Sequence, residues 1–342
     1  MWKSLHFIEK CIFVLNLFLG GLLLFGYVLP YIPPKYFAFS SLSLFTPLLL
    51  IINIFFMVLW IVKSKKVWLF SGVLFVLGIP FLNRFIQFSG ENNPQDTDIK
   101  LMSFNARVFN YYNWHTDTTL HTKIVDFIDQ EHPNIIAIQE FYRKESNSFD
   151  FYKYKKIIYK NAKDNIGQAI LSDYPIIHSG SLNFPHTKNN GIFADILIEK
   201  DTLRLYSLHF ESFHINPEEQ ELSQEGSKRL LLNLGKRFAL QQSQVELLEA
   251  HYKACPYKII LCGDFNNTAF SYLYRRIKSG GLQDSFVVCG KGFGQTFNFS
   301  YFPLRIDYIF TDPVLQLSSF KTFSDIKYSD HYPILATFRF AE

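Results

Sequence analysis

Hydrophobic residues follow two different patterns along the chain. In the first part they form three long runs without charged residues, at about residues 11–30, 38–62 and 67–83. Each run approaches the ~20 apolar residues that an α-helix needs to cross a bilayer. The runs predict three transmembrane helices, of which the third is the shortest and contains Pro80. A cleaved signal peptide is the alternative for the first run, but two more apolar runs follow it and no small-residue cleavage site does.

From about residue 100 the pattern changes to short apolar runs and two helical stripes. Helical spacing of apolar residues over 119–130 and within 227–253 predicts two main helices. Short apolar runs predict strands at 101–105, 134–140, 169–171, 192–198, 203–209, 257–263, 306–311, 315–320 and 334–340. This mixture predicts an α/β fold with packed β-sheets and helices outside. The expected organisation is a membrane anchor over 1–85, a polar linker over 86–99 and a catalytic domain over 100–342.

Charge is distributed unevenly between these parts. Residues 1–97 contain seven Lys/Arg and three Asp/Glu, whereas the remainder contains 27 of each sign. The net charge of +4 therefore belongs to the membrane-proximal part. The neutral second part gives no indication of a nucleic-acid-binding surface, which would show clustered positive charge.

Lysines in the short loops predict the orientation of the anchor. Two precede the first apolar run, one lies in the loop after it, and three lie in the next loop. Because basic residues in short loops mark the cytoplasmic side, the amino terminus is expected inside. Three crossings then place the domain over 100–342 outside the cytoplasm. If Pro80 breaks the third segment into a re-entrant or interfacial piece, the domain lies inside instead.

The four cysteines carry little information. Their spacing matches no metal-binding pattern, and whether Cys255 and Cys289 form a disulfide stays open.

One predicted strand end is the main candidate for a functional site. The apolar run Ile259-Ile260-Leu261-Cys262 stops at Gly263-Asp264-Phe265-Asn266. In a strand, Asp264 and Asn266 lie on the same face, so they can present a carboxylate and an amide together. A strand running into an Asx turn explains the same residues without any site.

Other predicted strands also end in polar groups. These groups are Asn105, Glu140, His209, Asp307 and the pair Asp330-His331. Asp307 lies on an apolar strand, where an unpaired carboxylate is costly to bury, so it needs a partner such as His331. Each residue also has an explanation without a site. Glu140 could be a solvated strand end, and His209 could be a hydrogen-bonded core histidine.

Taken together, these segments resemble the endonuclease/exonuclease/phosphatase family of metal-dependent phosphodiesterases. The matching motifs occur in the family's order: Ser103-Phe104-Asn105, Ile138-Gln139-Glu140, Gly167-Gln168-Ala169-Ile170-Leu171-Ser172, Ser207-Leu208-His209, Gly263-Asp264-Phe265-Asn266, Arg305-Ile306-Asp307-Tyr308-Ile309 and Ser329-Asp330-His331-Tyr332-Pro333. The resemblance covers nearly all of 100–342. It implies a four-layer α/β sandwich, two packed β-sheets flanked by helices, with the site at one edge.

The resemblance also implies a metal site. Glu140 is then the principal ligand of Mg²⁺, or of Mn²⁺, because a hard carboxylate oxygen suits such cations. Asn105 lies beside it as a neutral ligand or supporting donor, and Asp330 adds a second carboxylate. The substrate is a phosphoester: a lipid head group, a small molecule or a nucleic acid.

Catalytic roles follow for the remaining residues. Asp264 is expected to orient and deprotonate the attacking water, with Asn266 fixing that geometry and touching phosphate. Asp307 and His331 form a carboxylate–imidazole pair that holds the histidine protonated or tunes it as a base. His209 protonates the leaving oxygen or binds phosphate, and which histidine is the acid stays open.

Two departures narrow the subclass. Abasic-site endonucleases carry an acidic residue where this chain has Arg107, which disfavours a DNA-repair role. Inositol phosphatases usually have a tryptophan before the Gly-Asp pair and a basic residue soon after the asparagine, and this chain has neither. The aromatic run 109–115 either forms the floor of a substrate cleft or serves packing or membrane contact. Residues 291–296 form either a turn before a strand, which is favoured, or a loop that approaches phosphate.

The sequence thus predicts a membrane-anchored, extracytoplasmic, Mg²⁺-dependent phosphodiesterase or phosphatase. The sequence indicates no obligate protein partner. The expected partner of the apolar runs is the lipid bilayer. The alternative from a different functional class is a catalytically silent sensor or scaffold with the same fold, which binds a phosphorylated ligand. A transporter is disfavoured because the apolar runs contain no intramembrane charge.

Overall fold

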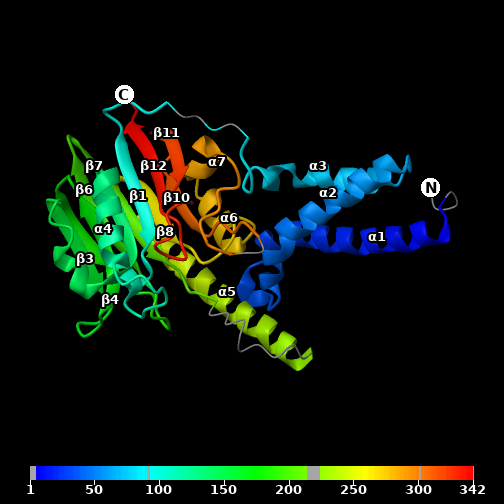
Figure 1. The fold of residues 1–342 in the computed structure, drawn as a ribbon, viewed down its shortest axis with the longest axis horizontal. Coiled ribbons are helices and arrows are strands. Elements are labelled where there is room, and N and C mark those ends of the chain that lie inside the picture. Colours follow the sequence, from blue (N-terminus) through cyan, green and yellow to red (C-terminus); the bar gives the residue numbers. More distant parts are fainter. Residues whose placement is uncertain (1–4, 89, 91–92, 214–223, 300–301, 342) are drawn as a thin grey trace. The chain divides into compact units, whose positions relative to one another are not determined.

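The computed structural model describes residues 5–88, 90, 93–213, 224–299 and 302–341 (Figure 1). These residues form two compact units. The first consists of 1–85, 215–242 and 269–276, and the second of 86–214, 243–268 and 277–342. Residues 89, 91 and 92 of the predicted linker lie outside the described residues.

The first unit contains three apolar helices. They are α1 (Phe7–Val28), α2 (Thr46–Val62) and α3 (Trp68–Leu82), with short 3₁₀ turns at Leu29–Tyr31, Pro34–Tyr36 and Ser40–Phe45. Two segments, Phe7–Tyr31 and Ser40–Val62, are long and apolar enough to cross a membrane. The prediction of about three spans is therefore not exact, because α3 has only 15 residues. At 1.5 Å per residue it measures about 23 Å, which is less than a ~30 Å hydrocarbon core. Pro80 lies inside α3 and does not end it.

A buried polar cluster joins these helices. Asn16 of α1 donates Nδ2 to Ser71 Oγ of α3 at 3.1 Å and accepts from Trp60 Nε1 of α2 at 3.0 Å. Hydrogen bonds of this kind hold helices together where the hydrophobic effect is absent. The outward faces are apolar instead: Phe18 and Phe55 are 62% and 61% exposed. This combination is typical of a helix group that lies in lipid.

The second unit is built on two six-stranded mixed sheets, as predicted. The first sheet has the order β11-β12-β1-β2-β4-β3, and the second has the order β5-β6-β7-β8-β10-β9. The strands of the first sheet are β1 (Ile99–Asn105), β2 (Ile135–Tyr142), β3 (Tyr154–Tyr159), β4 (Ile166–Ser172), β11 (Leu315–Thr322) and β12 (Ile334–Phe340). Those of the second are β5 (Ile176–Ser181), β6 (Gly191–Ile198), β7 (Asp201–His209), β8 (Lys258–Asp264), β9 (Gln283–Asp284) and β10 (Asp307–Thr311). Strands β3, β5 and β9 were not predicted.

Side-chain alternation places the core between the sheets. On β1, Leu101 belongs to the inner core together with Ala194 and Leu205 of the second sheet, whereas Met102 and Phe104 face outward. Alternation puts Ser103 and Asn105 on the inner face as well. The inner face thus changes from apolar to polar toward the carboxyl ends of the central strands. The polar inner positions are Ser103, Asn105, Gln139, Ser207, His209, Asp264 and Asp307.

Helices cover the outer faces of both sheets, which makes a four-layer α/β sandwich. Helix α4 (Leu120–Glu131) buries Ile124 and Ile128 in one cluster with Met102 of the first sheet. On the second sheet, His251 of α5 (Gln224–Lys253) contacts the rings of Phe193 and Tyr206. The short helices are α6 (Tyr272–Ser279) and α7 (Ser285–Cys289), with 3₁₀ turns at Arg107–Asn110 and Arg143–Asn147. All four cysteines are free.

Candidate active site

The register of the second sheet sets three candidate residues in one row. Asp264 ends β8 and pairs with His209 of the parallel strand β7 on one side. It pairs with Asp307 of the antiparallel strand β10 on the other. The sequence places each residue at a strand end, and the sheet makes them neighbours.

Gly263 is required for this arrangement. Its φ is +134°, and a Cβ at this position would lie 2.0 Å from the carbonyl oxygen of Leu208. Only glycine allows β7 to approach β8 this closely in that conformation. The glycine of the Gly-Asp motif therefore sets the separation of His209 and Asp264.

The carboxylate of Asp264 is buried and surrounded by donors. Its Oδ2 accepts from the amide of Asn105 at 3.1 Å and from that of Asn266 at 3.1 Å. The Nε2 atoms of His209 and His331 both lie 3.6 Å from the same oxygen. Burial raises the pKa of Asp264 to about 6, although the nearby His331 acts to lower it. A carboxylate of this kind suits a proton acceptor near neutral pH.

Asn266 holds the loop after β8 in place. Its backbone N–H donates to Asp264 Oδ1 at 2.8 Å, and its amide also donates to the carbonyl of Phe210 at 3.0 Å. It adopts a left-handed φ of 48°, which asparagine tolerates better than most residues. Asn266 therefore orients the Asp264 carboxylate, and its amide connects β8 to the segment after β7.

Asp307 and His331 form the carboxylate–imidazole pair that the sequence predicts. His331 Nδ1 lies 2.9 Å from Asp307 Oδ2, and both side chains are buried. Burial alone would lower the pKa of His331, but the carboxylates of Asp307 and Asp264 outweigh it and raise this pKa to about 10. His331 is therefore a cation at neutral pH, with Nε2 directed to Asp264.

The first sheet supplies the opposite wall of the site. Asn105 ends β1 and donates its amide to Glu140 Oε1 at 3.4 Å as well as to Asp264. Glu140 lies at a register shift in β2 and has a left-handed φ of 51°. Bulges of this type redirect a side chain, and here the carboxylate comes within 3.9 Å of His209 Nε2. Burial raises the pKa of Glu140.

Asp330 is held differently from the other candidates. Its carboxylate forms an ion pair with Arg107 Nε at 3.3 Å, and Arg107 stacks on the Trp114 ring at 4.3 Å. Arg107, which stands where abasic-site endonucleases carry an acidic residue, is thus the partner of the predicted metal ligand Asp330.

A buried polar chain connects the two sheets beneath these residues. Gln139 donates to Ser207 Oγ at 3.0 Å, and Ser207 donates to Gln168 Oε1 at 2.9 Å. Gln139 immediately precedes Glu140, and Ser207 lies two residues before His209. The chain therefore fixes the separation of the Glu140 and His209 walls.

The donor set fits a hard divalent cation beside Glu140. Glu140 and Asp330 offer carboxylate oxygens, and Asp330 lies close enough to raise the pKa of Glu140 further. A cation would supply the positive charge that a buried carboxylate lacks. Asn105 directs its amide nitrogen to Glu140 and its oxygen to the Arg107 N–H, so a ligand role requires its carboxamide to turn.

Asp264, Asp307 and His331 also bring ligand atoms within 4.8 Å of one another. This buried group fits Mg²⁺ less well, because His331 and Asp307 already use their facing atoms on each other.

Sequence reasoning missed two supporting hydroxyls. Ser329 Oγ donates to the carbonyl of Asn105 at 2.8 Å and accepts from the His331 N–H at 3.2 Å. Thr296 Oγ1 accepts from the N–H of Asp307 at 3.0 Å. Ser329 could have been recognised because it belongs to the Ser-Asp-His motif. Thr296 lies in a segment whose sequence favours a turn and gives no sign of a contact with Asp307.

Comparisons with known proteins agree with this geometry. The endonuclease/exonuclease/phosphatase family description matches residues 102–331, and a domain of unknown function (DUF8431) matches 9–85. A search of curated proteins found no match.

Similar solved structures share the fold. An endonuclease/exonuclease/phosphatase from Bacteroides vulgatus is 18% identical with a TM-score of 0.56, and the match covers 72% of this chain and 100% of that one. A mannosyl-6-phosphatase from Bacteroides thetaiotaomicron is 17% identical with a TM-score of 0.53, covering 71% and 100%. TDP2 from D. rerio, complexed with a single-strand DNA product, is 16% identical with a TM-score of 0.54, covering 71% and 100%.

Proposed function

Because the chain belongs to the endonuclease/exonuclease/phosphatase family and is a phosphoric ester hydrolase, we propose that it acts as a membrane-anchored, Mg²⁺-dependent enzyme at the Asp264 site. The observation that carries this proposal is the row of His209, Asp264 and Asp307, with His331 and Asn105 directed at the central carboxylate.

We assign each residue a separate step of the hydrolysis. Asp264 takes a proton from the attacking water, whose oxygen bonds to phosphorus while the bond to the leaving oxygen breaks. His331, kept protonated by Asp307, binds a phosphoryl oxygen through Nε2. His209 lies between Asp264 and Glu140 and can give its proton to the leaving oxygen.

A divalent cation held by Glu140, with Asn105 and Asp330 as further oxygen donors, would neutralise charge on the phosphoryl group. Mn²⁺ is expected to substitute for Mg²⁺, since both accept hard oxygen ligands.

The substrate and location follow from charge and hydropathy. Residues 98–342 are formally neutral, which favours a lipid head group or a small phosphoester over bulk DNA. Two helices that can span a membrane support an anchor. The lysine distribution places the amino terminus inside, so an extracytoplasmic catalytic domain requires that α3 also crosses, whereas two crossings would leave the domain in the cytoplasm. The proposed division is an anchor over 1–85, a linker over 86–99 and a catalytic domain over 100–342.

The test uses the full-length protein in detergent with Mg²⁺ and a generic phosphodiester and phosphomonoester. Asp264→Ala and His331→Ala should each lower turnover by roughly three orders of magnitude or more while circular dichroism stays unchanged. EDTA should do the same reversibly. Asp325→Ala, which removes an exposed carboxylate outside the site, is the matched control.

Full activity in either site variant, or in chelator, would refute the assignment. Metal-dependent binding of a phosphorylated ligand without turnover would favour a silent sensor instead.

A further inference from the structure

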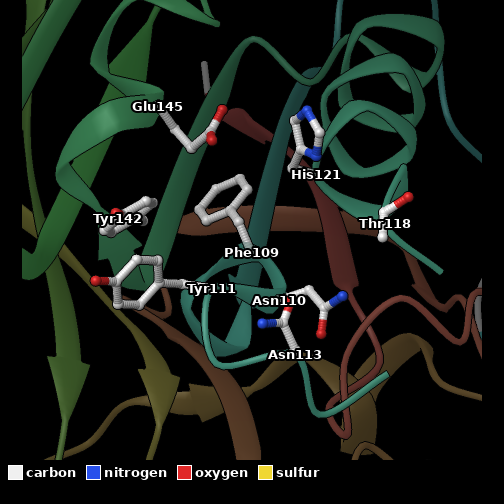
Figure 2. Close-up of a pocket in the computed structure, with 8 residues that line it drawn as sticks. All are labelled: Phe109, Asn110, Tyr111, Asn113, Thr118, His121, Tyr142 and Glu145. Atoms are coloured by element: carbon white, nitrogen blue, oxygen red, sulfur yellow. The ribbon is translucent and has the colours of Figure 1, made fainter. Parts of the chain in front are cut away.

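A separate pocket lies beside the active-site wall that carries Glu140. It has a volume of about 240 Å³, and Figure 2 shows the side chains that line it. They come from the segment after β1, the start of α4 and the end of β2. None of them has a role in the hydrolytic mechanism above.

One side of the pocket is aromatic. The Tyr111 and Tyr142 rings lie with centroids 4.3 Å apart at an interplanar angle of 32°. Phe109 is buried and packs edge-on against Phe141, so it forms a fixed apolar floor. Tyr111 is 45% exposed, which leaves part of its ring available to a ligand. Aromatic faces of this kind pack against the apolar face of a ring-shaped ligand.

The rest of the lining is polar. It consists of Asn110, Asn113, Thr118, His121 and Glu145 and contains no Lys or Arg of the described residues. The side chains of Asn113 and Thr118 have no hydrogen-bond partner among the described residues. Phosphate recognition normally uses Arg or Lys, so this pocket does not fit a second phosphate. It fits hydroxyl groups, which both donate and accept.

The backbone that forms the pocket is strained and rigidly held. Arg107, Val108, Phe109 and Asn110 all have left-handed φ values between 42° and 64°. Such a conformation is unusual for Val108 in particular, because its β-branched side chain clashes there. The Asn110 amide fixes the turn by donating to the carbonyls of His115 and Asp117 at 3.0 and 3.1 Å. Strain of this kind persists at ligand-binding sites when surrounding contacts enforce it.

The same segment connects the pocket to the active site. Arg107 begins the strained turn, donates its N–H to Asn105, and pairs with Asp330. On the next strand, Tyr142 lies two residues after Glu140, past the register shift in β2, and in the same buried cluster as Phe109. The pocket thus adjoins the strand ends that carry Asn105 and Glu140, and a group attached to a phosphoryl held at Glu140 would extend from these strand ends.

We propose that this pocket binds the uncharged, hydroxylated ring of the substrate alcohol, such as a pyranose, and so sets substrate specificity. The inference rests on the proposed function, because it takes the phosphoryl group to bind at Asp264 and Glu140. The ring packs on the exposed part of Tyr111, and its hydroxyls bind Asn113, Thr118 and Glu145.

Kinetics of the full-length protein in detergent with Mg²⁺ provide the first test. Phosphate release from hexose 6-phosphates is compared with release from ethyl phosphate, which has no ring. Tyr111→Ala should lower kcat/KM for the hexose phosphates about tenfold, mainly through KM, and leave ethyl phosphate unchanged. Tyr112→Ala, which changes the more exposed neighbouring ring outside the pocket, should alter neither substrate. Equal effects of Tyr111→Ala on both substrates would overturn the proposal.

Binding provides a second test that does not depend on turnover. Ligand-observed NMR measures methyl mannoside and methyl glucoside on the full-length protein in EDTA. Binding that Tyr111→Ala and Asn113→Ala abolish, and Tyr112→Ala preserves, supports the pocket. Binding of thymidine but of neither glycoside would overturn it. If the wild-type protein binds the glycosides but hydrolyses no phosphoester, the proposed function fails. If it hydrolyses phosphoesters but binds neither glycoside, the pocket assignment fails.

Discussion

At the scale of single residues, four of the candidate groups meet at Asp264. The amides of Asn105 and Asn266 and the imidazoles of His209 and His331 all surround its Oδ2 atom. The sequence indicated each residue as a polar strand end, but only their convergence separates a site from a set of turns. The predicted partnership of Asp307 with His331 is present in the structure, because a buried carboxylate requires one.

The substitution of Asp307 by asparagine tests this pair. Asp307→Asn keeps the side-chain shape but removes the charge that stabilises protonated His331. We expect turnover to fall roughly 10²- to 10⁴-fold with little change in KM, since the interaction acts on developing charge. Steady-state kinetics on a generic phosphoester would measure this. Asp325→Asn, an exposed carboxylate, should retain wild-type kinetics, and a wild-type rate for Asp307→Asn would contradict the proposed pair.

At the scale of secondary-structure elements, two pairs of parallel strands build the site. β1 and β2 are parallel in the first sheet, and β7 and β8 are parallel in the second. Their carboxyl ends carry the polar inner-face residues, and the chain through Gln139, Ser207 and Gln168 fixes the two sheets to each other below them. The strands themselves were predictable from apolar runs, whereas the pairing between sheets was not.

Removing the middle of this polar chain should weaken both stability and catalysis. Ser207→Ala leaves the Gln139 amide and the Gln168 carbonyl oxygen each short of one buried partner. The expected cost is about 1–3 kcal/mol in the free energy of unfolding, with a smaller kcat because the site walls lose their fixed separation. Urea unfolding followed by near-UV circular dichroism measures the first quantity. Ser179→Ala, on strand β5 of the same sheet, should change neither property.

The contact of α5 with the second sheet predicts a pH dependence of stability. Burial and the nearby Arg204 lower the pKa of His251, although Asp195 acts to raise it; the Tyr206 hydroxyl contacts Nδ1. The unfolded chain therefore binds more protons than the folded one, so stability declines as pH falls below the ordinary value of 6.5.

His251→Gln should flatten this decline between about pH 5 and pH 7, where histidine titrates. Thermal unfolding across that range measures the effect, with the exposed His186→Gln as control. An unchanged pH profile in His251→Gln would show that other groups cause the decline.

At the scale of the whole molecule, a basic, apolar part over residues 1–97 precedes a formally neutral phosphoesterase part over 98–342. The exposed faces of α1 and α2 are apolar, and the polar groups of this unit gather inside, around Asn16, Trp60 and Ser71. Lipid is the environment that suits such a distribution.

Membrane fractionation tests this arrangement. The full-length chain should remain in the pellet after extraction with alkaline carbonate, and the mature protein should retain α1 by mass spectrometry. A mature protein that begins after about residue 30 would identify α1 as a signal sequence.

The sequence by itself indicated the family, the α/β class and the candidate catalytic and metal-binding residues, because strand periodicity and strand-end chemistry are local properties of the chain. It also predicted three apolar segments from length and composition, of which two are helices long enough to cross a membrane. Tertiary structure decided which polar strand ends share one carboxylate, that Arg107 pairs with Asp330, and that the aromatic run forms a pocket with Tyr142. These features arise from register between strands and from packing of segments far apart in the chain, which no local pattern encodes.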